Sequence, residues 1–395
     1  MPAHIYLRVG RYYDAIMSSV IAIRSDNLYL ERCLVPYVPL HNIAMLVSAS
    51  LFSGDFVRAL EYTPFISTTM PAMAAVDLPA LFPTPRDIIL ARMGHWNEII
   101  ELFPGTSHSA VQREGVRSAK SALLSRRPQL GLLRSGTNGV ERALESNSIP
   151  KLASDVSSAA PLTVPPYVRA TQIYSQALAH TGLNNLVTAE ELLLELTSTV
   201  SNIPYDELPI EHPFYAYHHQ IGELFLGVAK SALLVKKSEK ADDQGDGMKQ
   251  AIGEMKAAVA LQSTFSYMEP EHFYFPTRHC LGALLLRAWD RTPPTNTAAR
   301  EALIAEAIDV YDADLREHPN NIWALKGLEI AYGFSSERRV AKDPGSAIER
   351  DAEDQRISGV TEKMNVLKPI KESAFEHTPE EFKNIQGSCC ELSLC

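Results

Sequence analysis

The sequence has few cysteines and no long hydrophobic run. Five cysteines in 395 residues do not form the disulfide framework of a small secreted domain. No apolar stretch reaches the roughly 20 residues that a membrane-spanning helix needs. No basic segment followed by an apolar core marks a secretory signal at the N-terminus. These absences predict a cytoplasmic protein with no membrane partner.

The sequence also lacks an excess of positive charge. It has 37 Lys and Arg against 47 Asp and Glu, which gives a net charge of −10. Nucleic acid is therefore not an expected partner, because binding the phosphate backbone needs a basic face. Hydrophobic residues make up 46% of the chain and charged residues 21%, which is ordinary for a folded globular protein.

Motifs of catalysis are missing as well. The sequence has no phosphate-cradling glycine loop, nucleophile elbow, dinucleotide fingerprint or His-Glu-x-x-His motif. Three cysteines close the chain, one ligand fewer than a tetrahedral thiolate site needs: Cys389, Cys390 and Cys395. These absences favour a protein that is not an enzyme and that needs no cofactor.

What the sequence does have is a six-residue turn that occurs three times, at Gly10–Ala15, Gly54–Ala59 and Gly94–Ile99. Each copy reads Gly, any residue, aromatic, two residues, then a small or aliphatic residue. The copies start 54 − 10 = 44 and 94 − 54 = 40 residues apart. A spacing of this size is typical of stacked helical repeats. We expect the glycine to reverse the chain at positive φ between two helices.

The pattern divides the chain into four parts. We expect helical repeats over 1–105, an irregular and partly mobile insertion over 106–165, further helical repeats over 166–334, and a charged, loosely structured tail over 335–395. Within the repeats, a connector over 26–39 and a capping box with Thr188 as N-cap are predicted. The predicted helices span 12–24, 41–52, 56–61, 87–93, 96–102, 166–181 and 248–261.

These positions resemble the tetratricopeptide repeat (TPR), over roughly residues 1–105 and 166–333. The residues that match its pattern are Gly10, Tyr12, Ala15, Ala22, Gly54, Phe56, Ala59, Leu281, Gly282, Ala307, Tyr311, Pro319, Trp323 and Gly327. The resemblance implies an all-α solenoid of helical hairpins, here with long connectors between the repeats. It also implies a protein–protein interaction scaffold that binds a peptide or protein segment in its concave groove.

Placed on this frame, the chain opens inside a repeat. Only a short helix can precede Gly10, and Ile5, Tyr6 and Val9 are left to pack on something. We therefore treat a homodimer through the N-terminal half-repeat as a hypothesis.

Several histidines fall at or near the starts of the first helices of the hairpins, including His4, His41 and His279. One interpretation is a metal or acid–base site in the groove. The other is that each histidine serves packing or a helix end. The segment 267–278 leaves a similar choice between a platform on which Arg278 binds a carboxylate and a connector whose aromatic residues cover a helix. The candidate binding residues are His4, Tyr6, Arg8, His41, Asn42, Glu269, Phe273, Tyr274, Arg278 and His279.

Overall fold

We describe a computed structural model of the protein over residues 2–32, 34, 39–68, 85–103, 166–207, 216–240, 246–342, 355 and 358–362. In these ranges the regular structure is entirely helical, which confirms the predicted all-α class. The helices are α1 (Pro2–Arg8), α2 (Tyr12–Glu31), α3 (Pro39–Ser53), α4 (Phe56–Thr68), α6 (Pro85–Met93), α7 (Trp96–Leu102), α10 (Pro166–Gly182), α11 (Leu186–Ser201), α12 (His218–Lys240), α13 (Asp246–Gln262), α14 (Thr277–Arg291), α15 (Thr297–Glu317) and α16 (Ile322–Lys342).

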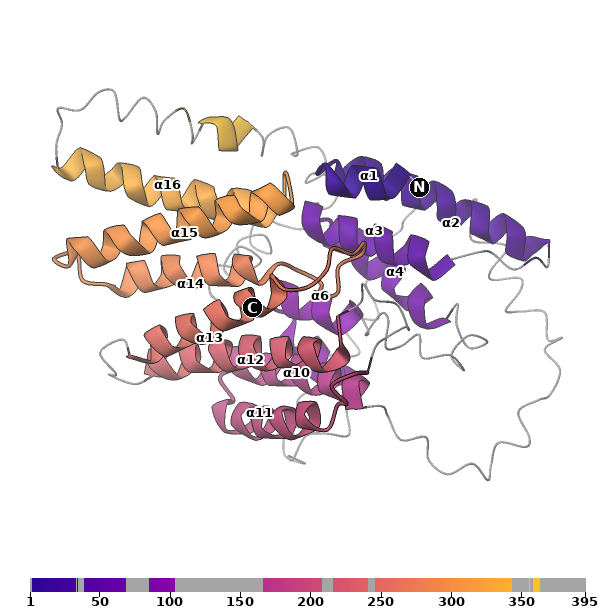
Figure 1. Ribbon diagram of the computed structural model, residues 1–395, viewed down its shortest axis with the longest axis horizontal. Helices are drawn as coiled ribbons and strands as arrows, with labels where there is room; N and C mark the ends of the chain where they lie inside the picture. Colours follow the sequence, from indigo (N-terminus) through magenta and orange to yellow (C-terminus); the bar gives the residue numbers. More distant parts are fainter. Residues whose placement is uncertain are drawn as a thin grey trace, which may run out of the picture.

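Helices that follow one another along the chain pack side by side, from α1 to α16 (Figure 1). Helices two apart also touch where α10 meets α12 and where α14 meets α16. We call α1–α7 the N-terminal arm and α10–α16 the C-terminal arm. None of the described helices combines the length and the hydropathy that a bilayer crossing requires.

The three repeated turns have the conformation that the sequence predicts. Gly10, Gly54 and Gly94 have φ values of 72°, 79° and 73°, a region that residues with a Cβ atom avoid. The aromatic residue of the motif then begins the next helix in each copy, as at Tyr12 and Phe56. Both of these rings are buried, so the turn also anchors the hairpin to the core.

Several predicted boundaries are wrong. α2 continues to Glu31, so the first part of the predicted connector over 26–39 is helix. The predicted capping box at Thr188 is also wrong, because α11 begins at Leu186 with Asn185 as its N-cap. Prolines begin some of the helices, as at Pro39 and Pro85, because the first helical position needs no N–H donor.

Other predictions fall outside the described residues. These are the insertion over 106–165 and the cysteine-rich end of the tail, with Cys389, Cys390 and Cys395. α16 runs past residue 334, to Lys342.

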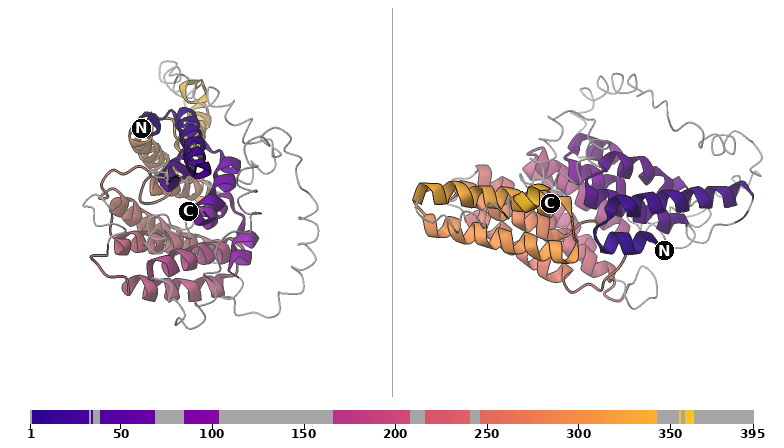
Figure 2. Two further views of the ribbon diagram at one scale, coloured as in Figure 1. Left: turned by 90° about the vertical axis from the view of Figure 1, so that its right-hand side faces the viewer. Right: turned by 90° about the horizontal axis from the view of Figure 1, so that it is seen from above.

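The two arms meet where α6 and α7 pack on α10 and near the ends of other helices, and α2 and α16 extend in opposite directions from this junction (Figure 2). The indole N–H of Trp323 in α16 donates to the carbonyl oxygen of Leu51 in α3, at 2.9 Å. The α1–α2 turn lies so close to Pro319 that a Cβ atom at Gly10 would stand 1.9 Å from its carbonyl oxygen. Trp96 of α7 lies against Gly182 at the end of α10. The start of the N-terminal arm therefore packs against the last helices of the C-terminal arm.

Two glycines allow α14 and α16 to approach α15 closely. A Cβ atom added to Gly282 or Gly327 would stand 2.3 or 2.1 Å from the ring of Tyr311. Tyr311 is 2% exposed, and close packing leaves its ring little room to move aside. These are positions at which the sequence resembles the TPR pattern.

The first prediction concerns this packing. Gly327→Ala should lower the free energy of unfolding by about 1–3 kcal/mol, because the added methyl group overpacks the Tyr311 ring. Gly253→Ala is the matched control, since nothing lies within 4 Å of its Cβ position. It should stabilise the protein by about 0.5–1 kcal/mol through helix propensity. Urea unfolding measures both, and equal effects of the two changes would contradict the packing described.

Candidate functional site

The site is built around an irregular segment between α13 and α14, residues 263–276, which we call the aromatic connector. Phe273 and Phe275 are 1% and 6% exposed, and their ring centroids lie 4.8 Å apart. Phe273 also lies 5.7 Å from the ring of Phe225 in α12 and 6.5 Å from that of Tyr174 in α10. The connector thus adds aromatic rings to the core of the C-terminal arm.

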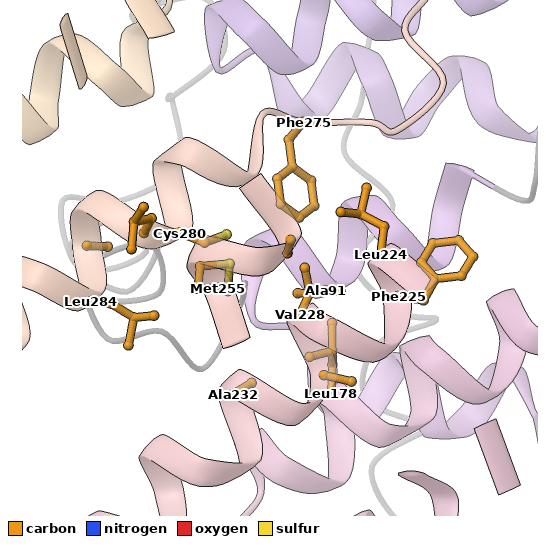
Figure 3. Close-up of a cluster of buried hydrophobic side chains, with 14 of the residues drawn as sticks. Ala91, Leu178, Leu224, Phe225, Val228, Ala232, Met255, Phe275, Cys280 and Leu284 are labelled. Atoms are coloured by element: carbon orange, nitrogen blue, oxygen red, sulfur yellow. The ribbon is translucent and has the colours of Figure 1, made fainter. Parts of the chain in front are cut away.

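The same segment reaches the N-terminal arm. Figure 3 shows Phe275 in one apolar cluster with Ala91 of α6, Leu224 of α12 and Cys280 of α14. The guanidinium of Arg92, at the end of α6, lies 4.4 Å from the Phe275 ring centroid and 4.3 Å from that of Trp323. Such cation–π contacts are strengthened by desolvation. The connector is therefore enclosed by helices from both arms.

Gln262, the last residue of α13, holds the end of the connector in place. Its side-chain amide nitrogen donates to the carbonyl oxygen of Phe275 at 3.1 Å. Its carbonyl oxygen accepts from the backbone N–H and the hydroxyl of Thr277, both at 2.7 Å. One amide side chain thereby supplies partners to two backbone groups that no helix pairs here, and to one hydroxyl.

A buried polar network lies next to these rings. It contains His279, one of the candidate binding residues. Arg92 donates to Nδ1 of His279 at 2.8 Å, so the ring proton lies on Nε2, which donates to Asp314 at 2.9 Å. Burial lowers the pKa of His279, and Arg92 adds to the effect, while Asp314 opposes it. His279 is therefore neutral.

His318, the residue after α15, has the opposite charge state. Its Nδ1 donates to the second oxygen of Asp314 at 2.9 Å, and its Nε2 donates to Glu271 of the connector. Burial acts to lower the pKa of His318, but the carboxylates of Glu271 and Asp314 outweigh it and raise the pKa to about 10. Together with Arg92, the network contains two cations and two anions, so no buried charge is left uncompensated.

A second group joins α1, α3 and the connector. Nδ1 of His4 lies 2.6 Å from Glu269, and Nε2 of His4 lies 3.0 Å from Nε2 of His41. Burial, followed by the nearby charge of His4, lowers the pKa of His41 to about 4, so His41 is neutral and its Nε2 accepts a hydrogen bond from Nε2 of His4. Burial raises the pKa of Glu269, and its bond to His4 opposes this. His4 keeps 32% of its side chain exposed.

The other candidate residues are already engaged in internal contacts. Arg278 donates to Glu317 at 2.6 Å and to Ser263 at 3.0 Å. Asn42 donates to Asp26 at 2.8 Å. Tyr274 is half-buried where the two arms meet. Tyr6 packs against the core of the N-terminal arm. Arg8 is exposed, and its guanidinium lies 4.1 Å from the ring centroid of Tyr267.

The structure therefore brings together His4, His41 and Glu269, and separately places His279 beside the connector. His218 and His219 lie elsewhere, where His218 bonds Glu207 and stacks on Tyr167 at 3.9 Å. For Phe273, complete burial favours the interpretation of 267–278 as a connector that covers helices.

The geometry restricts the chemistry of the site. In the described part of the chain, no three His, Cys, Asp or Glu side chains are grouped to hold a metal ion. Cys280 is fully buried and disulfide-bonded, so it offers no thiolate ligand. A cleft between the arms, lined by Phe52, Tyr274 and Trp323 among others, has room for about one water molecule. It is too small for the small-molecule ligands that proteins usually enclose.

Comparison with protein-family models, with curated proteins and with solved structures finds no match for this chain. The chemistry of the site must therefore be argued from its own residues.

The second prediction concerns the charge of His318. Its folded pKa is raised, so its contribution to stability is complete below the unfolded pKa of about 6.5 and is lost as the pH rises towards 10. His318→Gln should lower the free energy of unfolding by on the order of 4 kcal/mol at pH 6, and the difference should shrink steadily at higher pH. Urea unfolding of both proteins between pH 6 and pH 10 measures this. A difference that is constant with pH would show that His318 is not a buried imidazolium.

Proposed function

We propose that the chain is a TPR-type interaction scaffold whose inner face binds an extended segment of a protein or peptide. By inner face we mean the surface between the two arms that surrounds the aromatic connector. One observation supports the proposal above others. This surface already holds an irregular segment, residues 263–276, by burying the rings of Phe273 and Phe275 and pairing its carboxylates with histidines.

A partner segment would add at the part of this surface that remains open. We call it the open rim and define it as Arg8, Tyr267, His4 and His41. Arg8 is exposed and Tyr267 is 54% exposed, so a cation and an aromatic ring stand together in solvent. This combination suits a carboxylate next to an apolar side chain, which Arg8 would pair and Tyr267 would cover. An acidic–apolar segment is the partner chemistry that fits.

The net charge of the chain and the size of the cleft both agree with binding at the open rim. A net charge of −10 disfavours acidic partners in general, so the guanidinium of Arg8 at the rim would direct such a segment to one place. The cleft between the arms holds about one water molecule, which suits contact along a surface better than enclosure of a small substrate. A cytoplasmic location stays a prediction.

The alternative function is metal binding or enzymatic chemistry by the groove histidines. The observation that favours it is the approach of His4 Nε2 to His41 Nε2, with Glu269 on the other side of His4. Carboxylate–histidine pairs of this kind orient metal ligands in many proteins. Against it stands the lack of a third ligand in the described residues. Elemental analysis separates the two functions, since bound metal that is lost on changing His4→Ala would favour the alternative.

The third prediction tests the scaffold. Peptides selected from a random library displayed on phage should carry an acidic residue beside apolar ones. Arg8→Ala should weaken their binding about tenfold, the loss expected for one charge-assisted hydrogen bond. Lys249→Ala is the control, because Lys249 lies on α13 with 78% of its side chain exposed and pairs with Asp246 of its own helix. Fluorescence anisotropy with labelled peptides measures the affinities.

Two results would contradict the proposal. One is a library that yields no peptide above background. The other is a set of binders whose affinity is unchanged by both Arg8→Ala and Tyr267→Ala.

A further inference from the structure

The longest helix of the N-terminal arm, α2, exposes an apolar stripe. Tyr13, Met17, Ile21 and Leu28 are 47%, 39%, 65% and 54% exposed. At 100° per residue these four side chains fall within an arc of about 80° on one side of the helix. Residues that line a solvated face are normally polar, so four large apolar side chains in one row need an explanation.

This stripe faces away from the rest of the described molecule. α2 packs on α1 and α3, through the buried side chains of Tyr12, Ala15 and Ile16. α1 and α2 lie at the edge of the array in both views of Figure 2. Each further hairpin of such an array buries the previous one, so an outer face with this composition is suited to packing against another helix.

The order of the residues along the stripe shows which helix fits. The face consists of positions 13, 17, 20, 21, 24 and 28, with Val20 half-buried and Arg24 exposed. In a pair of identical antiparallel helices, two residues lie opposite each other when their numbers have a constant sum. The positions of the stripe pair in this way about the point between 20 and 21, since 13 + 28, 17 + 24 and 20 + 21 all equal 41. We propose that α2 of a second copy of this chain docks antiparallel on this stripe, about a two-fold axis between Val20 and Ile21.

In this register every apolar side chain of the stripe meets an apolar group. Tyr13 lies opposite Leu28 of the second copy, and Val20 lies opposite Ile21. Met17 lies opposite Arg24, whose aliphatic stem can cover it. A two-fold axis makes each of these contacts twice, as an isologous interface requires.

The charges agree with the same arrangement. Two copies with a net charge of −10 each repel one another, so a contact surface must avoid uncompensated acids. Among the described side chains, Asp14 is an acidic residue beside the stripe, and it already pairs with Arg11 at 2.7 Å. The antiparallel register also brings Arg24 within one helical turn of Asp14 of the second copy. The interface therefore gains two favourable charge pairs among the described side chains.

The size of the interface sets the expected affinity. α2 has 20 residues and is about 30 Å long. A helix pair of this length, widened by the exposed Ile5 and Val9 of α1, buries roughly 800–1,000 Å² in total, which is at the low end for specific interfaces. A dissociation constant in the micromolar range follows. This contact involves neither the open rim nor the connector, so it stands or falls independently of peptide binding.

The fourth prediction is measured by light scattering on the full chain between about 1 and 100 μM, the range in which a micromolar dimer assembles. The mass should rise from the 43.7 kDa of one chain towards twice that value. Ile21→Glu should hold it at one chain, because each glutamate would replace an apolar contact with Val20 of the second copy and the two carboxylates would lie close together at the axis. Leu194→Glu is the control, since Leu194 is 72% exposed on α11, and it should dimerise like the natural chain.

A third variant tests the register. Met17→Glu should still dimerise, because the new carboxylate would lie opposite Arg24 of the second copy. Circular dichroism confirms that each variant keeps its helices. A mass of one chain at every concentration, or a dimer that Ile21→Glu leaves intact, would overturn the proposal. Loss of the dimer in Met17→Glu would overturn the antiparallel register.

Discussion

The burial of Phe273 and Phe275 between the two arms is the constraint on which the rest of the structure depends. An irregular segment is usually found at the surface, because its backbone groups need partners. Here Gln262 supplies partners to the end of the segment, and the rings supply apolar contact to α6, α10 and α12. The aromatic connector therefore supplies the apolar contact that direct packing of α12 on α14 would supply in an array with shorter connectors.

The polar network beside the rings shows how one environment gives two histidines different charges. His279 and His318 share the carboxylate of Asp314, and His279 is buried while His318 keeps 14% of its side chain exposed. His279 receives a hydrogen bond from Arg92 and is neutral, whereas His318 donates to a second carboxylate and is charged. The difference comes from the partner at the other ring nitrogen, since a guanidinium opposes a second positive charge and a carboxylate favours it. The network locks α6, α14, α15 and the connector into one arrangement.

The features that could be predicted from the sequence are those set by the conformational preferences of single residues. Gly10, Gly54 and Gly94 were predicted to reverse the chain at positive φ, and all three do so, because only glycine adopts this conformation without strain. The extent of α2 was not predicted. Its second half contains Ser25, Asp26 and Asn27, which disfavour helix by themselves, and the bond from Asn42 to Asp26 is a tertiary contact that no local pattern reveals.

The candidate site was less predictable for a related reason. The sequence singled out His4, His41 and Glu269, and the structure places them together. It did not single out Arg92, Asp314 or His318, which complete the second network. Arg92 and His279 are 187 residues apart, and nothing in the local sequence of either pairs them. Only Asp314 and His318 carried a local signal, because a spacing of four places both at one side of the end of α15.

The central claim is that the connector unites both arms into one cooperative unit. Of the three tryptophans, Trp96 reports on α7 and Trp289 on α14. Urea unfolding followed by fluorescence in two single-tryptophan variants, each with and without Phe273→Leu, tests this claim most directly. The account predicts that both probes report the same transition and that Phe273→Leu shifts both to lower urea by the same amount. Two separate transitions, or a shift at Trp289 alone, would contradict it.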